Sequence, residues 1–240
     1  MRVNKLMLQY VCASLLIVIC AATVYKLFLL EKVPALTASS TYELRTVILD
    51  AGHGGKDGGA VSVTGTAEKV LNLDIVLRMQ DVFEVLGYDV ILTRETDTEL
   101  SHADGGSRKM QDLKGRLEIA RKNRGIPFIS IHMNKFPVEK YKGLQIYYSP
   151  IPESKELAET IRGSVVGNID STNKRSSKPS GSAIYLLHHA VSPSVLIECG
   201  FLSNNEEAVL LDSEEYRSKL SIVIASAVDM WYNTYEIPKG

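Results

Sequence analysis

The segment Thr46-Val-Ile-Leu-Asp50-Ala-Gly-His53-Gly-Gly decides the fold, because a β-branched apolar run leads directly into a glycine-rich turn. The run has the length of a buried strand. Similar runs recur at residues 88–93, 127–131, 144–148 and 194–197. Longer segments with helical patterns separate them. This alternation predicts an α/β domain whose sheet is mostly parallel.

The helical segments show apolar residues three and four positions apart, which places them on one helical face. The first such face consists of Leu71, Ile75, Met79, Val82 and Leu86, and Gly87 ends the helix. We expect further helices over residues 111–123, 153–169 and 213–235. The Ser, Asn, Lys and Pro content of residues 170–181 predicts a mobile loop.

The N-terminal segment differs in kind from the rest of the chain. Arg2 and Lys5 precede a largely apolar stretch, residues 6–30, whose length approaches the roughly 20 residues that span a bilayer. We predict an uncleaved signal anchor over residues 1–30, and a cleaved signal peptide stays open as the alternative. A linker over 31–44 and a single domain over 45–240 follow. Positive charge before the apolar stretch predicts that everything after about residue 31 faces outward.

Composition and cysteine content limit the remaining choices. The 240-residue chain has an ordinary composition and a formal net charge of −1, which argues against a nucleic-acid partner. Of three cysteines, only Cys199 lies in the predicted domain, so no disulfide is expected there. We predict a buried Cys199, because strand neighbours face opposite ways and Glu198 is expected to face a cleft. Lipidation of Cys20 is not expected, since bulky Ile19 precedes it.

Four side chains with metal or proton chemistry follow or close the predicted strands. His53 sits in Gly-His-Gly-Gly after the first strand, and Glu68 lies in the first turn of the next helix. His132 ends the run 127–131, and Glu198 closes the run 194–197. In an open α/β sheet, loops after strands and the following helix N-termini open onto one crevice at the carboxyl ends of the strands. We therefore expect these residues to converge.

A catalytic zinc hydrolase needs three N or O donors that leave one coordination position open, and a further carboxylate that moves a proton. We predict one zinc ion per chain, held by His53, Glu68 and His132, with Glu198 as the catalytic residue. A carboxylate on a buried strand is expensive unless it is paired, metal-bound or functional. Asp50 and Asn134 could orient the imidazoles by hydrogen bonds.

Each of these residues also has a plainer explanation. His53 could be a solvated loop residue, His132 a core histidine and Asp50 a turn residue, while a carboxylate at position 68 favours the helix dipole without any metal. A phosphate-binding loop is excluded, because Asp50 stands where that motif needs glycine and Asp57 where it needs Ser or Thr. The remaining histidines, His102, His188 and His189, are expected at the surface or behind the site.

Five motifs together resemble the zinc N-acetylmuramoyl-L-alanine amidases of the amidase 3 family. In chain order they are Leu-Asp-Ala-Gly-His53-Gly-Gly, Glu68-Lys69, Thr93-Arg94-Glu-Thr-Asp97, Ser-Ile-His132-Met-Asn134 and Glu198-Cys-Gly-Phe-Leu-Ser-Asn204. The resemblance implies a twisted, mostly parallel six-stranded sheet flanked by helices. It also implies zinc on the two histidines and Glu68, a catalytic Glu198, and cleavage between N-acetylmuramic acid and the L-alanine of peptidoglycan stem peptides.

One small domain behind an apolar N-terminus is similar to the sporulation amidases of endospore formers. That similarity implies action on spore cortex peptidoglycan, as the first step to muramic-δ-lactam, in the forespore intermembrane space. An accessory protein that aids zinc or substrate binding is a further partner to test. The 101–110 insertion departs from the common pattern and could alter substrate access. A zinc exopeptidase with two metals and a non-catalytic peptidoglycan-binding scaffold are the alternatives.

Overall fold

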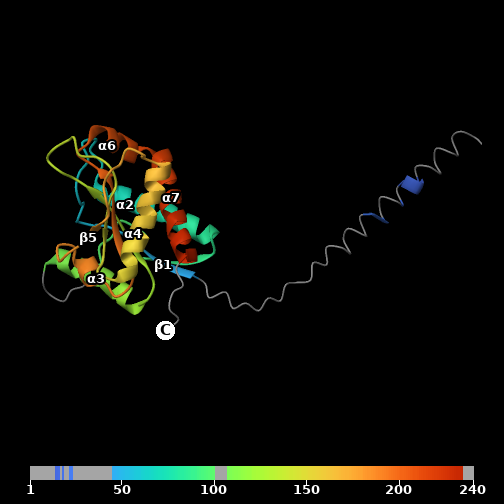
Figure 1. Ribbon diagram of the computed structural model, residues 1–240, viewed down its shortest axis with the longest axis horizontal. Helices are drawn as coiled ribbons and strands as arrows, with labels where there is room; N and C mark the ends of the chain where they lie inside the picture. Colours follow the sequence, from blue (N-terminus) through green and yellow to red (C-terminus); the bar gives the residue numbers. More distant parts are fainter. Residues whose placement is uncertain (1–13, 17, 19–21, 24–44, 101–106, 235–240) are drawn as a thin grey trace, which may run out of the picture. The chain divides into compact units, whose positions relative to one another are not determined.

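The computed structural model describes residues 14–16, 18, 22–23, 45–100 and 107–234 (Figure 1). The chain separates into two compact units, Met1–Glu43 and Leu44–Gly240. The described residues of the first unit are helical. No helix within the described residues is both long and apolar enough to cross a membrane. Most of the predicted signal segment, the linker 31–44, His102 and most of the 101–110 insertion lie outside the described residues.

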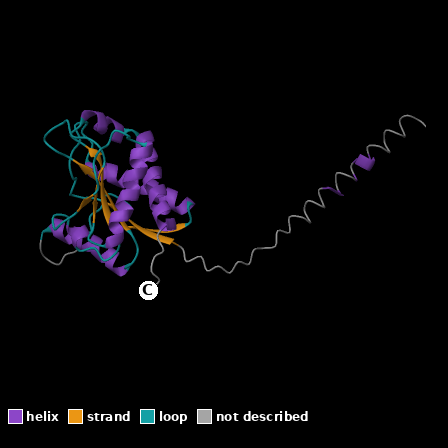
Figure 2. Ribbon diagram, in the orientation of Figure 1, coloured by secondary structure: helices purple, strands orange, loops and turns teal. Residues whose placement is uncertain are grey.

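The second unit contains both strands and helices (Figure 2). They largely alternate along the chain, as predicted. The strands are β1 (Arg45–Ala51), β2 (Tyr88–Leu92), β3 (Phe128–Asn134), β4 (Gln145–Tyr148), β5 (Lys178–Pro179) and β6 (Ser194–Phe201). The helices are α2 (Glu68–Val85), α3 (Arg108–Lys122), α4 (Pro152–Asn168), α5 (Tyr185–His188), α6 (Asn205–Asp212) and α7 (Glu214–Thr234).

The six strands form one sheet in the order β2-β1-β3-β6-β4-β5. All neighbouring strands run parallel except β4, which is antiparallel to β6. The predicted fold class, a mostly parallel α/β sheet with helices around it, is therefore confirmed. The central position of β1, β3 and β6 brings their carboxyl ends together, and these strands lead to or carry His53, His132 and Glu198.

Several element bounds differ from the prediction. β3 continues two residues beyond His132, and β6 continues to Phe201 beyond Glu198, so both side chains lie within strands rather than at their ends. In each strand a polar residue, His132 or Glu198, interrupts the apolar run, so the run alone predicts a strand that is too short. Two residues of the segment predicted as a loop, 170–181, form β5 by pairing with β4. The short helices α5 and α6 were not predicted.

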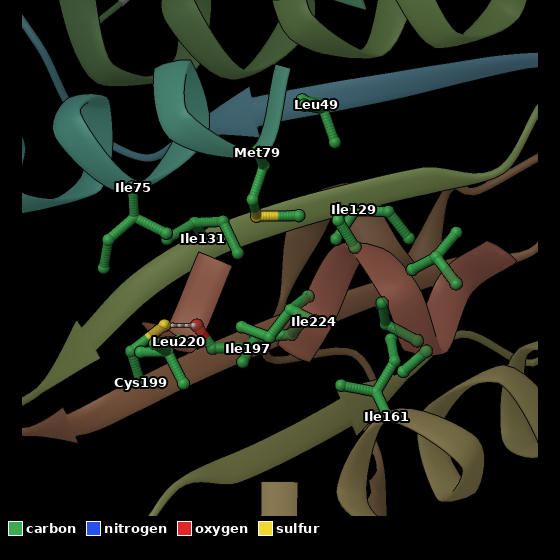
Figure 3. Close-up of a cluster of buried hydrophobic side chains, with 14 of the residues drawn as sticks. Leu49, Ile75, Met79, Ile129, Ile131, Ile161, Ile197, Cys199, Leu220 and Ile224 are labelled. Atoms are coloured by element: carbon green, nitrogen blue, oxygen red, sulfur yellow. Dashed lines mark hydrogen bonds between the residues drawn. The ribbon is translucent and has the colours of Figure 1, made fainter. Parts of the chain in front are cut away.

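Helices cover the two faces of the sheet unequally. Helices α2, α4 and α7 pack on one face, where they enclose the larger apolar core, and α3 and α5 pack on the other (Figure 1). Side chains of the larger core come from alternate strand positions, because strand neighbours point to opposite faces. Figure 3 shows Ile129 and Ile131 of β3 beside Ile197 of β6, with Ile224 of α7 packed on them. Each such buried side chain contributes about 1.5–3 kcal/mol to folding.

Cys199 belongs to this core, as its alternation with Glu198 predicts. Its side chain is buried and its thiol donates to the Ile197 carbonyl over 3.9 Å (Figure 3). It is a free cysteine. Burial raises the pKa of the thiol, and the nearby negative charge of Glu198 raises it further. The interpretation of Cys199 as a small core residue is thereby confirmed.

Candidate metal centre

His53, Glu68 and His132 converge at one point, as the sequence predicts. One ligand atom from each residue lies within 4.8 Å of the other two, and among the described residues only this group is close enough to hold a metal ion. The imidazole rings of His53 and His132 lie 5.0 Å apart, edge to face. They come from the loop after β1, the first turn of α2 and strand β3. Two imidazole nitrogens and one carboxylate oxygen match the three protein ligands of a catalytic zinc site.

Glu68 is the central residue of this group. Its Oε1 lies 3.0 Å from Nδ1 of His132 and 3.2 Å from Nε2 of His53, and it also accepts from the Met133 backbone N–H over 3.1 Å. Its Oε2 accepts from the Ala60 N–H over 2.8 Å. Burial raises the pKa of Glu68, but hydrogen bonds with the two imidazoles outweigh burial and hold the pKa well below its usual range. Glu68 is therefore ionised and held in place by these hydrogen bonds.

His53 stands in a left-handed backbone conformation, with φ at 61°. This region is uncommon for a residue with a side chain, and histidine is among the residues that enter it more often. Its Nδ1 lies 2.8 Å from Oδ2 of Asp57, which leaves Nε2 directed at Glu68. Burial lowers the pKa of His53, but the hydrogen bonds and charges of Glu68 and Asp57 more than compensate and raise it. Carboxylates commonly orient metal-binding imidazoles in this way.

Asp57 was not assigned this role from the sequence. The signal was present, since an aspartate four residues after a histidine in a glycine-rich turn can close back on the imidazole. Gly59 allows that closure, because a Cβ at this position would lie 2.6 Å from Glu68 Oε2 and 2.8 Å from the His53 ring. Gly52 is equally constrained, since its Cβ would lie 2.3 Å from the His132 ring.

Cationic side chains hold the backbone of the His53 loop. Arg94 donates to the carbonyls of Ala51 and Gly52, and Arg116 donates to those of Ala51 and His53, over 2.7–3.1 Å. Because the two arginines together bind three consecutive carbonyls, the backbone that carries the imidazole of His53 is held rigidly. Lys69 adds a bond of 2.7 Å to the Gly55 carbonyl and pairs with Asp97. The Arg94 and Asp97 contacts give a structural role to two residues of the Thr93–Asp97 motif.

The structure places Asp50 next to Arg116 rather than next to an imidazole. The carboxylate of Asp50 is fully buried, forms an ion pair with Arg116, and accepts hydrogen bonds from Ser130 and Thr93. Burial raises the pKa of Asp50, but Arg116 and the two hydroxyls bring it below its ordinary value. Arg116 therefore links Asp50 to the His53 loop, since the same guanidinium donates to the His53 carbonyl. The carbonyl of Asn134 accepts from Leu202 N–H, and the orienting role of its side chain stays a prediction.

Glu198 lies on the same face of the sheet as His132, because the two residues are register partners in β3 and β6. Its other register partner is Gln145 of β4. Oε2 of Glu198 is buried and has no hydrogen-bond partner among the residues that the structure describes, so one carboxylate oxygen is available to exchange a proton. Burial raises the pKa of Glu198 to about 7, and the charge of Glu68 adds to the shift while the histidines oppose it. A carboxyl group with such a pKa can act as base and acid near neutral pH.

The two remaining described histidines lie elsewhere. His188 and His189 sit at the end of α5, where the ring of His189 packs 4.5 Å from that of Tyr185 and 4.9 Å from that of His188. Neither belongs to the metal-binding group. His102 lies outside the described residues.

An α/β domain with a histidine and carboxylate site at the carboxyl ends of its strands belongs to a class that includes metal-dependent hydrolases. The model of one family, Amidase_3 (N-acetylmuramoyl-L-alanine amidase), matches residues 47–230. The chain therefore belongs to the Amidase_3 family of N-acetylmuramoyl-L-alanine amidases. The resemblance drawn from the five sequence motifs is confirmed. Because its substrate is cell-wall peptidoglycan, the family acts outside the cytoplasm.

Individual relatives agree with this assignment. The chain is 36% identical over 188 residues to a germination-specific N-acetylmuramoyl-L-alanine amidase of Bacillus subtilis, covering 77% of this chain and 78% of that protein. Among solved structures it is similar to the CwlD amidase of Clostridioides difficile in complex with the GerS lipoprotein, with 40% identity, a TM-score of 0.75, and coverage of 80% and 100%. The amidase AmiC2 of Nostoc punctiforme is 31% identical, with a TM-score of 0.69 and coverage of 79% and 97%.

Proposed function

We propose that this amidase is zinc-dependent and that His53, Glu68 and His132 hold one zinc ion while Glu198 transfers the proton. The observation that carries this proposal is the convergence of two imidazole nitrogens on one ionised carboxylate oxygen, with a second, partly unpartnered carboxylate on the neighbouring strand. The donor set fits zinc, which prefers nitrogen and carboxylate oxygen ligands and keeps an open position in catalytic sites.

A zinc ion in this site would supply Lewis acidity, which polarises a carbonyl and makes water more acidic. The protein's own groups carry the rest of the reaction. Glu198 takes a proton from the attacking water, and the same carboxyl group returns it to the L-alanine nitrogen as the amide bond breaks. Burial of Glu198 favours both steps, since a pKa of about 7 lets it exist in either state near neutral pH. Asp57 holds the His53 ring so that Nε2 faces the site.

The experiment is mass spectrometry of the products that the full-length protein, supplied with zinc, releases from purified peptidoglycan. Release of stem peptides that begin with L-alanine, absent with the Glu198→Gln variant, would support the proposal. The matched control is Glu156→Gln, which changes an exposed carboxylate on α4 and should retain full release. Equal release by wild type and Glu198→Gln would refute the role of Glu198.

We further propose that the substrate is spore cortex peptidoglycan and that the cut is the first step to muramic-δ-lactam. The likeness to a germination-specific amidase supports this role. Spores formed without this chain should then lack muramic-δ-lactam. A normal muramic-δ-lactam content in spores formed without this chain would refute the cortex role, while the amidase assignment would stand.

The N-terminal segment fits the same proposal. Residues 1–30 would anchor the chain in a membrane and residues 31–44 would link the anchor to the catalytic domain, 45–240, in the forespore intermembrane space. An accessory protein is a further partner to test, since the similar CwlD amidase was solved in complex with a lipoprotein. Protease protection of the full-length chain in membrane vesicles, with and without a cytoplasmic tag at residue 1, tests this orientation.

A further inference from the structure

A cationic hollow lies between the segment before β4 and the segment after α4. It measures about 330 Å³, and its lining includes the basic residues Lys140, Lys142, Lys174 and Arg175 and one carboxylate, Asp170. Lys142 is partly neutralised by Glu206 at 3.3 Å. The lining thus carries four basic side chains against one carboxylate. We refer to these lining residues as the basic hollow.

The basic hollow is next to the proposed catalytic face. Strand β4 begins at Gln145, the register partner of Glu198, and Gly143 of the hollow stands two residues earlier. The guanidinium of Arg175 lies 4.6 Å from the ring centroid of Phe201, three residues after Glu198 in β6. Both Glu198 and Arg175 act on Tyr147 of β4: burial and Glu198 raise the pKa of this tyrosine, and Arg175 lowers it.

Arg175 is fixed in place but keeps its charged end available. Its Nε donates to the Lys142 carbonyl over 2.8 Å and its backbone N–H donates to Oδ1 of Asn173 over 3.0 Å. Asn173 is itself buried and donates to the Leu144 carbonyl. In the described part of the chain, the two terminal nitrogens of Arg175 make no hydrogen bond. A guanidinium held in this way presents a planar fork that suits a carboxylate.

We propose that the basic hollow is a subsite for a carboxylate of the acidic stem peptide of the substrate. The proposal rests on the catalytic site proposed above. The stem peptide is attached at one end of the bond that is cut, so its acidic groups lie to one side of Glu198. The basic hollow offers positive charge beside Glu198 that could bind one of these groups. The charges lie away from the reacting atoms and therefore strengthen binding of substrate and transition state alike. Their loss raises KM more than it lowers kcat.

The test compares two soluble muramoyl peptides that differ only in their stem carboxylates, which are free in one and primary amides in the other. With the full-length, zinc-loaded protein, kcat/KM for the free acid should exceed that for the amide by about threefold to tenfold, as a few partly exposed ion pairs provide. This preference should shrink with rising salt, because exposed charges are screened. The preference should reside in KM.

Variants locate the preference in the basic hollow. The double variant Lys174→Gln/Arg175→Gln should bring the ratio of the two kcat/KM values close to one, and Arg175→Lys should keep part of it because the charge remains. The matched control is Lys155→Gln, an exposed lysine on α4 that lines a different hollow. This variant should keep the full preference. Thermal unfolding of each variant verifies that it is folded.

Two results would overturn the subsite: a wild type that cleaves both substrates equally well, or a folded double variant that keeps the preference. Wild-type protein that cleaves neither substrate would instead refute the proposed catalytic site. Calorimetric binding of the two peptides to the Glu198→Gln variant then decides the subsite separately. Tighter binding of the free acid supports it, and equal binding refutes it.

Discussion

Adjacent residues of β3 and β6 show two different uses of the same strands. Ile131 and Ile197 point to the face covered by α2, α4 and α7 and are fully buried in the apolar core. His132 and Glu198, each one residue later, point to the opposite face, where His132 belongs to the candidate metal centre and Glu198 is its register partner. Because successive strand residues point to opposite faces, the same two strands contribute core side chains to one face and site side chains to the other.

The face with the metal centre also has a buried polar core of its own. Asp50 and Arg116 are both fully buried there, and their ion pair leads by one further hydrogen bond to the His53 carbonyl. Apolar packing holds the face covered by α2, α4 and α7, whereas on the face covered by α3 and α5 a buried ion pair and its hydrogen bonds add to a smaller apolar cluster. Substitutions on the two faces should therefore produce different losses.

The largest expected effect is that of His132→Ala compared with its neighbour Met133→Leu. Loss of a metal ligand should reduce zinc affinity by more than the roughly 10–100-fold seen when an outer partner of a ligand is removed. Activity should fall with zinc content. Met133 faces the apolar core, so Met133→Leu should cost less than about 1.5 kcal/mol and retain zinc. Zinc content by mass spectrometry after dialysis measures both, and a His132→Ala protein that keeps its zinc would break the comparison.

Arg116→Met should cause the next largest loss. It leaves the Asp50 carboxylate buried without the positive charge that compensates it, which costs about 3–5 kcal/mol of unfolding free energy, and it also removes the hydrogen bond to the His53 carbonyl. Chemical denaturation measures the stability and zinc titration measures the site. The double variant Arg116→Met/Asp50→Asn removes the uncompensated charge and should be more stable than Arg116→Met alone. A double variant less stable than the single one would contradict this account of the pair.

Ile197→Ala tests the face covered by α2, α4 and α7. Truncation of this fully buried side chain should lower the unfolding free energy by about 2–5 kcal/mol, while kcat per folded molecule stays close to that of the wild type. The control Ile222→Ala changes an exposed residue of α7 and should stay within about 0.5 kcal/mol. If Ile197→Ala abolished activity without lowering stability, the separation of the two faces would be wrong.

The smallest expected effect is a pH-dependent one at Asp74 of α2, which pairs with Arg78 on the same helix and with Arg217 of α7. Burial raises the pKa of Asp74, but the two arginines outweigh it and lower the pKa. A lowered pKa stabilises the fold above the unfolded value near 3.9, and this stabilisation disappears as the pH falls through the folded value.

Asp74→Asn should thus cost roughly 0.2–1 kcal/mol at pH 7, because the pair is partly exposed, and progressively less as the pH falls below the unfolded value near 3.9 and through the folded pKa. Melting temperatures across this pH range measure the difference. The control, Asp81→Asn, removes an exposed carboxylate on the same helix and should change the unfolding free energy at pH 7 by less than about 0.5 kcal/mol. A difference for Asp74→Asn that grows toward low pH would reverse the sign and contradict the assignment.

Much of the fold was predictable from the sequence, because its signals are local. Apolar runs and helical spacing found five strands and the helices α2, α3, α4 and α7. Strand β5 carried no such signal, since its two residues, Lys178 and Pro179, are strand-like only through pairing with β4. The carboxyl ends of β3 and β6 were also missed, because His132 and Glu198 interrupt the apolar run from which a strand is recognised.

The candidate site divides in the same way. The rule that loops after parallel strands share one edge was enough to bring His53, Glu68 and His132 together. Arg116 was not predictable, because its partners are contributed by the first strand and its loop, more than sixty positions earlier in the chain, and no local pattern links them. Asp57 was within reach of the sequence, since it contacts His53 four residues away.

Anomalous diffraction at the zinc absorption edge, from crystals of the full-length protein grown with zinc, tests the central claim most directly. The account predicts a single peak about 2.0–2.2 Å from Nε2 of His53, Nδ1 of His132 and the Glu68 carboxylate, on the face that carries Glu198. A peak elsewhere on the chain, two peaks in the site, or none at these three residues would contradict it.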